Sequence, residues 1–432
     1  MGAAPLQSQA MPAERASTVS IEELGRRARA AARILANAST SQKNDALLKA
    51  ANALLAHAAE IQGQNSLDLA AAEAAGMEPG PLDRLRLSDT RIEAMAQGLR
   101  QVATLPDPIG EVLDGWRRPN GLEISRTRVP LGVVAIIYEN RPNVTSDAAG
   151  LCLKSGNAAL LRGSGSALRS NLAIAKALRK GFAVAGLPED CLVLVDDATH
   201  ETAVGVMRLT EYVDCLIPRG GPALIKSVRE NATVPVIIDG DGNCHVYVDA
   251  SADLEMARSI VMNAKTQRTS VCNAAESLVI HADLLESFLP IICAELEGAG
   301  VVLVGDEASR SRVASIQPAT DDDFGREFLE LKMSVAVVTS LDEAIDHINR
   351  FGTGHSEAII TTDLDAARRF TREVDAAAVL VNASTRFTDG EEFGFGAEIG
   401  ISTQKLHARG PMGLRELTTY KYVVWGDGQV RT

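Results

Sequence analysis

The stretch that decides the fold is residues 133–163, VVAIIYENRPNVTSDAAGLCLKSGNAALLRG. It opens and closes with unbroken apolar runs, VVAIIYE (133–139) and AALLRG (158–163), and the segment between them has the composition of a helix. Continuous apolar strands separated by a helix are typical of a parallel sheet that is covered on both faces. The stretch therefore predicts an α/β fold in which ligands bind near the carboxyl ends of the strands.

The alternation of strands and helices continues toward the carboxyl terminus. Further strands are expected at 191–197, 213–220, 234–239 and 244–249, with helices between most of them. After residue 249 the pattern restarts without a repeat of fixed period, which predicts a second α/β domain and not a duplication. The Gly-rich segment 391–402 is expected to be a loop.

The amino-terminal third is predicted to be helical. Ser20 followed by Glu23 has the spacing of a capping box, so a helix should begin there. A second helix is expected from Ser41 onward, because its alanines and leucines form one apolar stripe. Ser88 and Thr90 are candidate caps for a third helix.

A β-hairpin is predicted where the helical sequence pattern ends, in WRRPNGLEISRTRVP, residues 116–130. Asn120 and Gly121 form a strong hairpin-turn signal between two short polar strands. Such a hairpin buries little by itself, so its edge is expected to pair with a strand from elsewhere, in the same chain or in another subunit, and residues 419–431 are the candidate. An ordinary surface hairpin is the alternative.

The composition limits the classes of function. The chain has 432 residues and 46% hydrophobic content, with a net charge of -13, which argues against nucleic-acid or anionic-membrane partners. Six scattered cysteines without a CxxC pair predict neither a disulfide framework nor a zinc or other metal site. The first seventeen residues lack the apolar core of a signal peptide and are expected to be a loose tail. A cytoplasmic location is therefore expected.

The loop NAKTQRTSVCNAAE, residues 263–276, contains the strongest candidate for catalysis, Cys272. A thiol reacts as its thiolate, so a catalytic cysteine needs local groups that lower its pKa. Lys265 and Arg268 lie just upstream and carry positive charge. The alternative is a buried cysteine of the core, but a polar loop between a helix and a strand favours the catalytic role. The polar neighbours of Cys272 are Ser270, Asn273 and Glu276.

Other candidates lie at the ends of predicted strands. Asn140 and Asn143 can donate a side-chain amide to an oxyanion, or can serve as turn residues around Pro142. At the end of AALLRG, Arg162 suits a cofactor 2′-phosphate, and the turn that follows can hold a phosphate or can be a tight turn only. The same applies to the end of the strand VDCLIPRG, residues 213–220. The residues at these two ends are Gly163, Ser164, Arg219, Gly220 and Gly221.

Several stretches of the chain resemble, in their order, the aldehyde dehydrogenase superfamily, and within it the branch that reduces glutamyl phosphate. They include VVAIIYENRPNVTSDAAGLCLKSGNAALLRG, IPRGG, IDGDGNCHVYVD and NAKTQRTSVCNAAE. The resemblance covers the chain from about Ser20 to the carboxyl terminus. It implies two parallel-sheet domains and a small strand flap that builds a homodimer or higher oligomer. The implied ranges are 18–118 and 129–248 for an NADP-binding domain with a return segment at 391–412, 249–390 for a catalytic domain, and 119–128 with 413–432 for oligomerisation.

The resemblance also implies residue roles. Cys272 is the implied nucleophile and Asn140 the implied oxyanion donor. Arg162 stands where the superfamily has an adenosine-ribose lysine, and Glu330 resembles the glutamate that holds the nicotinamide ribose, although Lys332 replaces the usual phenylalanine nearby. The substrate-binding candidates are Arg268, Thr269, Ser270 and His245, the last of which is alternatively a structural strand histidine.

One departure from the superfamily bears on the reaction. The glutamate that activates water in hydrolytic members is absent, and the corresponding run, IDGDGNCH, offers only the shorter Asp239. An enzyme that takes its acyl group from an acyl phosphate does not need that base. The implied reaction is the NADPH-dependent reduction of L-glutamyl 5-phosphate to L-glutamate 5-semialdehyde through a Cys272 thioester, in proline biosynthesis.

The alternatives are a hydrolytic NAD(P)-dependent aldehyde dehydrogenase and a non-catalytic binding protein on the same scaffold. The acyl phosphate is expected from a separate protein, a glutamate 5-kinase, because no kinase-like segment precedes these blocks.

Overall fold

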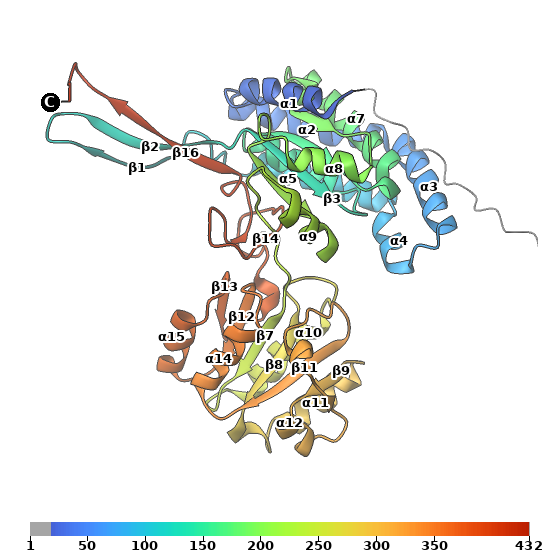
Figure 1. The fold of residues 1–432 in the computed structure, drawn as a ribbon, viewed down its shortest axis with the longest axis vertical. Coiled ribbons are helices and arrows are strands. Elements are labelled where there is room, and N and C mark those ends of the chain that lie inside the picture. The colour runs from blue at the N-terminus through green and yellow to red at the C-terminus, as the bar shows by residue number, and fades with distance from the viewer. Residues whose placement is uncertain (1–18, 432) are drawn as a thin grey trace, which may run out of the picture. The chain divides into compact units, whose positions relative to one another are not determined.

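The computed structural model describes residues 19–431, and the segment expected to be a loose tail lies outside them. The chain divides into two compact units. Unit 1 runs to Val236 and resumes at Leu417, and unit 2 is Ile237–Glu416. Each contains a parallel sheet flanked by helices, which confirms the predicted α/β class (Figure 1). Within residues 19–431, no helix combines the length and the apolar composition needed to cross a membrane.

The sheet of unit 1 has the strand order β5-β4-β3-β6, and all its pairs are parallel. Every residue of β3 is buried, as expected for a strand covered on both faces. Because β3 lies between β4 and β6, the carboxyl ends of these three strands meet at one edge. The strands are β3 (Val133–Tyr138), β4 (Ala158–Arg162), β5 (Leu192–Leu194) and β6 (Cys215–Arg219).

Helices surround this sheet, and three of them begin at serine caps. The hydroxyls of Ser20, Ser39 and Ser88 accept from the backbone N–H three residues later, which satisfies donors that the first helical turn leaves open. The long helix expected from Ser41 is broken at His57 into α2 and α3. The helices are α1 (Ile21–Leu35), α2 (Thr40–Ala56), α3 (Ala58–Ala74), α4 (Pro79–Leu85), α5 (Asp89–Thr104), α6 (Val144–Lys154), α7 (Leu168–Val184), α8 (His200–Met207) and α9 (Pro222–Asn231).

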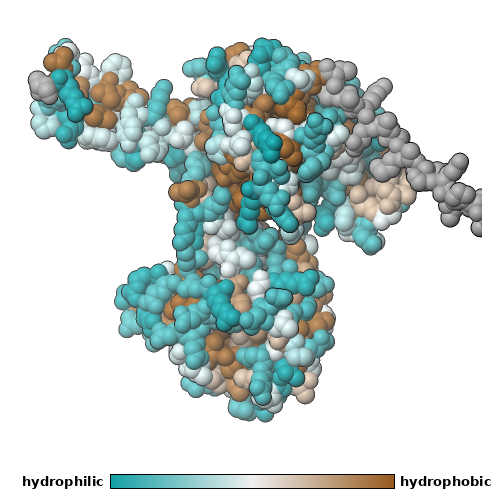
Figure 2. Space-filling model, in the orientation of Figure 1, coloured by the Kyte–Doolittle hydropathy of each residue, from teal (hydrophilic) through white to brown (hydrophobic). Residues whose placement is uncertain are grey.

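An antiparallel arm extends unit 1, formed by β1 (Val112–Arg117), β2 (Glu123–Pro130) and β16 (Thr418–Trp425) (Figure 1). Gly121 adopts a φ of 92°, which the predicted turn requires. The pairing of β2 with the carboxyl-terminal strand of the same chain confirms the expected edge partner. The arm exposes aromatic and aliphatic side chains, and hydrophobic colours appear on it in Figure 2.

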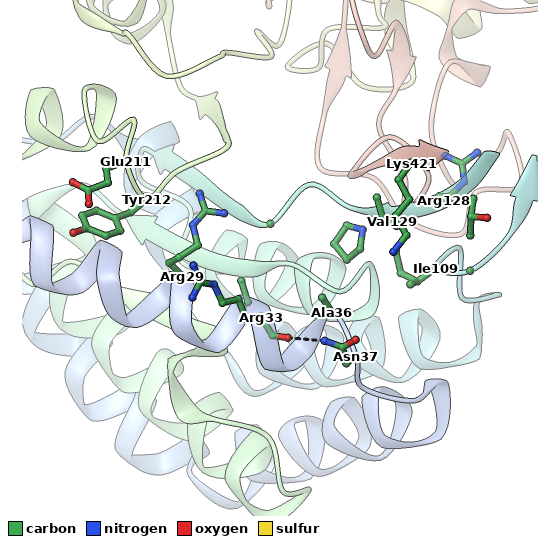
Figure 3. A pocket seen from close by; sticks show the side chains of 15 residues that line it. Arg29, Arg33, Ala36, Asn37, Ile109, Arg128, Val129, Glu211, Tyr212 and Lys421 are labelled. Carbon is green, nitrogen blue, oxygen red and sulfur yellow. Dashed lines mark hydrogen bonds between the residues drawn. The ribbon is translucent and has the colours of Figure 1, made fainter. Parts of the chain in front are cut away.

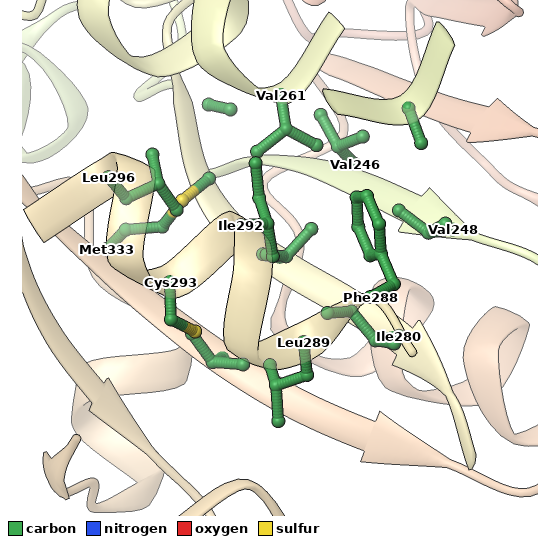
Figure 4. Packing of buried hydrophobic residues seen from close by; sticks show 14 of the residues in the cluster. Val246, Val248, Val261, Ile280, Phe288, Leu289, Ile292, Cys293, Leu296 and Met333 are labelled. Atoms are coloured by element: carbon green, nitrogen blue, oxygen red, sulfur yellow. The ribbon is translucent and has the colours of Figure 1, made fainter. Parts of the chain in front are cut away.

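The sheet of unit 2 has seven strands in the order β10-β9-β11-β8-β7-β12-β13, again all parallel. Helices α10 (Leu254–Thr266) and α11 (Leu289–Gly298) cover part of one face. Figure 4 shows Phe288 beside Val248 and Ile292 beside Val261 in the core between them. The strands are β7 (Cys244–Val248), β8 (Ala275–His281), β9 (Val302–Gly305), β10 (Gln317–Pro318), β11 (Lys332–Val338), β12 (Ser356–Ile360) and β13 (Ala378–Val381).

The remaining elements of unit 2 connect and flank these strands. Its helices are α10 (Leu254–Thr266), α11 (Leu289–Gly298), α12 (Glu307–Arg312), α13 (Asp321–Phe324), α14 (Leu341–Phe351), α15 (Leu364–Glu373) and the 3₁₀ turn η4 (Thr385–Phe387). A two-stranded ribbon follows the expected glycine-rich loop, made of β14 (Ile401–Ser402) and β15 (Gly410–Pro411).

The structure differs from the sequence-based expectation in three places. Residues 234–239 do not form a strand, because Pro235 has no N–H to donate, and only two isolated bridges form, Val236 with Leu216 and Asp239 with Ser402. The boundary between the units falls at Val236 and not at residue 248, because β7 is hydrogen-bonded between β8 and β12. The return segment 391–412 belongs to unit 2, where the N–H of Ile401 donates to Asp239.

Candidate functional site

The Cys272 loop connects α10 to β8 in unit 2, and its main chain is held against the start of β7. The Cys244 thiol donates to the carbonyl oxygen of Cys272 at 3.1 Å. A Cβ added at Gly242 would lie 1.7 Å from the same oxygen, so only glycine permits this approach. The run IDGDGNCH therefore positions the loop that carries the predicted nucleophile.

Cys272 differs from the other cysteines in exposure. It is half-buried, while the other five are buried, and none of the six, all within residues 19–431, forms a disulfide. Burial raises the pKa of Cys191 and of Cys293 to about 12 and that of Cys244 well above its usual value. A thiol must ionise to attack, so Cys272 is the cysteine suited to nucleophilic chemistry.

The charged neighbours of Cys272 fall into two groups. Lys265 is fully buried and lies 2.5 Å from the Glu276 carboxylate, so its charge is compensated by that carboxylate and does not face the thiol. Burial lowers the pKa of Lys265 and raises that of Glu276 to about 7, against the opposing attraction between the two charges. Arg268 is exposed and forms no hydrogen bond or ion pair within the described residues. The expectation that Lys265 activates Cys272 is thus corrected.

An arginine that the sequence analysis missed lies beside this loop. The Nε of Arg386 donates to Gln267 Oε1 at 2.7 Å, and the Asn273 amide donates to the carbonyl oxygens of Arg386 at 3.4 Å and Thr388 at 2.9 Å. Burial, and next the charge of Arg268, lower the pKa of Arg386. The signal available in the sequence was the polar run NASTRFTDG directly after a strand.

His245 does not belong to the accessible site. Its side chain is fully buried, and its Nδ1 lies 2.9 Å from the Glu357 carboxylate, which also accepts from the His245 backbone N–H. The His347 ring packs edge-on against it. A substrate-binding role for His245 is therefore corrected to a structural one, the alternative left open by the sequence.

Glu330 is exposed and follows Leu329, whose φ is 57°. The N–H of Leu329 donates to Glu276 Oε1 at 3.0 Å, so the buried Lys265–Glu276 pair also fixes the main chain before Glu330. Lys332, which replaces an expected phenylalanine, pairs with Asp323 at 3.1 Å and lies over the Phe328 ring.

Asn140 in unit 1 has the geometry of an amide donor. Its φ is 38°, and its side-chain oxygen accepts from the hydroxyls of Ser164, at 3.1 Å, and Ser166. Because the oxygen is engaged, the amide nitrogen is the end left for a ligand. The parallel pairing of β3 with β4 brings Asn140 and Ser164 to the same sheet edge, as the sequence predicted.

The other strand-end candidates make specific contacts in unit 1. The Arg162 guanidinium donates to the carbonyl oxygens of Ala198 and Thr199. A Cβ on Gly163 would lie 2.1 Å from the Asn171 amide, so close side-chain packing explains this glycine without a ligand. This agrees with the tight-turn alternative for that position.

The turn at Arg219, Gly220 and Gly221 is occupied by a carboxylate. The N–H of Gly221, at the amino end of α9, donates to Glu139 Oε2 at 3.0 Å, and a Cβ on Gly220 would lie 2.6 Å from the same atom. A cofactor phosphate at this helix end would meet a like charge, which does not fit the predicted role of the two glycines.

Unit 1 also contains a cavity of about 910 Å³ (Figure 3). Arg29 and Arg33 of α1 and Arg128 and Lys421 of the arm contribute basic side chains to it, and Arg29 pairs with Asp214 at 2.7 Å. None of the site residues predicted from the sequence is among its described lining residues. The cavity is separate from the edge at which Asn140 and Ser164 meet.

These features are typical of an enzyme of the aldehyde dehydrogenase class. They are an α/β unit with a parallel sheet on each side of Val236, a half-buried cysteine on a loop whose main chain packs against Gly242, and an amide donor at a strand end. Residues 5–313 and 333–423 match the sequence model described as "Aldehyde dehydrogenase family", and the chain belongs to this family. Membership implies a nicotinamide cofactor.

Within that family its relatives are gamma-glutamyl phosphate reductases, which confirms the branch inferred from the sequence. One, from Syntrophomonas wolfei, is 58% identical over 95% of this chain and 98% of its own length. Another, from Clostridium beijerinckii, is 57% identical over 94% and 98%. The crystal structure of gamma-glutamyl phosphate reductase from Thermotoga maritima superposes with a TM-score of 0.93 at 49% identity, covering 95% of this chain and 99% of that one.

The residues of unit 1 fit a nicotinamide dinucleotide in part. The hydroxyls of Ser164 and Ser166 and the Arg162 guanidinium at the end of β4 suit sugar and phosphate groups. The Glu139 carboxylate at α9 does not suit a phosphate. The fit therefore rests on the β4 end of the sheet edge and not on the glycine turn after β6.

Proposed function

We propose that this protein reduces L-glutamyl 5-phosphate to L-glutamate 5-semialdehyde and inorganic phosphate, as a gamma-glutamyl phosphate reductase of proline biosynthesis. The observation that carries the proposal is the half-buried Cys272, on a loop whose main chain packs closely against Gly242, in a chain 58% identical to such a reductase. A cytoplasmic location, and a glutamate 5-kinase as the source of the acyl phosphate, complete the proposal.

In the proposed mechanism the Cys272 thiolate attacks the acyl carbon. The Asn140 amide and the Cys272 N–H donate to the oxyanion of the tetrahedral adduct, and the C–O bond then breaks so that phosphate leaves. The acyl group remains as a thioester. NADPH, when bound, supplies the hydride that reduces this thioester, and Arg162, Ser164 and Glu330 are the residues that would hold it. Cleavage of the C–S bond then releases the aldehyde and restores Cys272.

A hydrolytic NAD(P)-dependent aldehyde dehydrogenase is the alternative function. Hydrolysis needs a base beside the thioester, and the candidate carboxylate, Asp239, accepts the N–H of Ile401 at 2.9 Å and is shorter than a glutamate. Asp239 is thus engaged by the main chain of β14, which supports the reductase over the hydrolase.

The test runs the reaction backward. Glutamate semialdehyde and NADP are supplied with and without inorganic phosphate, and NADPH absorbance is followed. The reductase should turn over only with phosphate, because phosphate must take the acyl group from Cys272. Sustained turnover without phosphate would instead identify the hydrolase, and no NADPH under either condition would indicate a binding protein.

We further propose that the arm assembles a homodimer. Trp116, Tyr422, Val424 and Trp425 are between 43% and 70% exposed, a concentration of apolar surface that a partner subunit would cover. Light scattering of the full chain in solution distinguishes a dimer from a monomer.

A further inference from the structure

Arg386 is a partly buried cation that forms no ion pair within residues 19–431. Its one side-chain hydrogen bond goes to the neutral Gln267, and no carboxylate of residues 19–431 lies within ion-pair distance of it. Burial lowers the pKa of Arg386 and the charge of Arg268 lowers it further, while the charge of Asp389 opposes them only in part. A desolvated cation next to a second cation is costly unless an anion joins them. The two arginines together therefore suit an anionic ligand.

The position of Arg386 relative to Cys272 is fixed from two sides. Its carbonyl oxygen accepts from the amide of Asn273, the residue after Cys272. Its guanidinium contacts Gln267, the residue before Arg268. The charge of a Cys272 thiolate also acts on the pKa of Arg386, in the direction that raises it. Arg386 is thus held close to the atoms that react.

Buried polar atoms around Arg386 also lack partners. The Oδ1 of Asn273 and the hydroxyls of Thr385 and Thr388 form no hydrogen bond, although these residues are 4%, 0% and 0% exposed. Thr385 precedes Arg386 in η4, and the Asn273 amide donates to the carbonyl oxygens of both Thr388 and Arg386. Unsatisfied polar groups that recur around an unpaired arginine indicate an unfilled polar site.

We propose that Arg386 and Arg268 bind the phosphate group of the acyl phosphate, a deepening that rests on the proposed function. In the substrate the phosphate is attached to the carbon that Cys272 attacks, while the α-carboxylate is several bonds further away. An arginine fixed beside Cys272 therefore meets the phosphate. Its planar guanidinium can donate two parallel hydrogen bonds to phosphate oxygens.

The two arginines assist one defined bond exchange. In the forward direction the C–S bond forms, the C–O bond to phosphate breaks, and phosphate leaves with the electron pair. In the reverse direction an oxygen of inorganic phosphate attacks the thioester carbon, and the Cys272 thiolate leaves. Holding the phosphate lowers the cost of both directions without changing formation of the thioester from the aldehyde.

The test separates these two half-reactions. Without phosphate, glutamate semialdehyde and NADP should give one burst of NADPH per active site as the thioester forms. Phosphate should then start steady turnover. For Arg386→Gln the burst should persist, while the KM for inorganic phosphate rises roughly 10- to 100-fold, the loss expected for a hydrogen bond to a charged group. Arg386→Lys should show a smaller rise, because it keeps the charge and loses the paired donors.

A matched control and a second readout complete the design. Arg350→Gln, which removes an arginine paired with Asp321 on the surface of unit 2, should keep the wild-type KM for phosphate. Inorganic phosphate should slow alkylation of Cys272 by iodoacetamide in the wild type and not in Arg386→Gln. The alkylation assay needs no turnover, and the measurement on the wild type does not depend on whether a variant folds.

The outcomes distinguish this inference from the proposed function. An unchanged KM for phosphate, a rise confined to the KM for the semialdehyde, or no protection of Cys272 by phosphate in the wild type would each overturn the phosphate site. A wild-type enzyme that gives no burst would overturn the thioester mechanism itself.

Discussion

The Cys272 loop has an open side and a buried side, and the polar residues on the two sides have opposite environments. On the open side Cys272 and Arg386 are half-buried, Arg268 is exposed, and neither arginine forms an ion pair within residues 19–431. On the buried side Lys265 and Glu276 form a closed pair at 2.5 Å. Cys244 and His355 lie 3.6 Å apart in the same interior, between Sγ and Nδ1.

The difference separates groups that act on a ligand from groups that hold the loop. An unpaired charge near the surface is available to a substrate, whereas a charge compensated in the core is already used. Lys265 and Arg268 are three residues apart in the sequence, yet Lys265 is paired with Glu276 in the core and Arg268 is exposed, where the proposal has it bind the substrate. The side of the loop, and not the residue type, decides the role.

The largest expected effect comes from exchanging sulfur for oxygen on each side. Cys272→Ser should lower kcat by about 10³-fold or more, since the covalent nucleophile is lost. Cys244→Ser should change kcat by no more than a few fold, because its hydroxyl still donates to the Cys272 carbonyl. Steady-state assays and circular dichroism of both variants measure this contrast. A reversed pattern, with only Cys244→Ser inactive, would move the nucleophile to the buried side.

The next effect tests whether the buried pair is structural. Lys265→Met should lower the free energy of unfolding by about 3–5 kcal/mol, because it leaves the Glu276 carboxylate buried without its partner. Urea unfolding measures the loss. Lys226→Met, at an exposed lysine, should stay within about 0.5 kcal/mol of the wild type. The double variant Lys265→Met with Glu276→Gln should recover part of the stability, and an additive loss would argue against the pair.

The smallest effect is a pH dependence on the buried side. Burial lowers the pKa of His355 to about 4, below its usual 6.5, so the unfolded chain binds a proton that the folded chain refuses. This contribution to stability is present above pH 6.5 and is lost as the pH falls toward 4. The stability difference between wild type and His355→Asn should therefore shrink by about 3 kcal/mol between pH 7 and pH 4. Urea unfolding at the two pH values measures the difference, and a difference for His355→Asn that stays constant between them would refute the assignment.

The burial of the polar residues agrees with sequence reasoning on the open side of the loop and differs from it on the buried side, while the catalytic and binding roles stay predictions. Cys272 was identifiable because a polar loop between a helix and a strand is unusual surroundings for a core cysteine. His245 and Lys265 were predicted to lie near the reacting atoms because their neighbours in the sequence are polar. A strand, however, directs every second side chain into the core, and a helix directs every third or fourth one there. Arg386 was missed because its contacts to Gln267 and Asn273 join segments far apart in the chain.

By itself the sequence determined the local elements of this protein. Apolar runs fixed the buried strands of both sheets, serine caps fixed helix starts, and Asn120–Gly121 fixed the turn of the arm, since each depends on residues close in the chain. Only the tertiary structure decided that β7 belongs with unit 2, that Lys265 and Glu276 compensate each other, and that Arg386 lies beside Cys272. Those outcomes depend on which distant segments pack together, and burial then sets the free-energy cost of every charge.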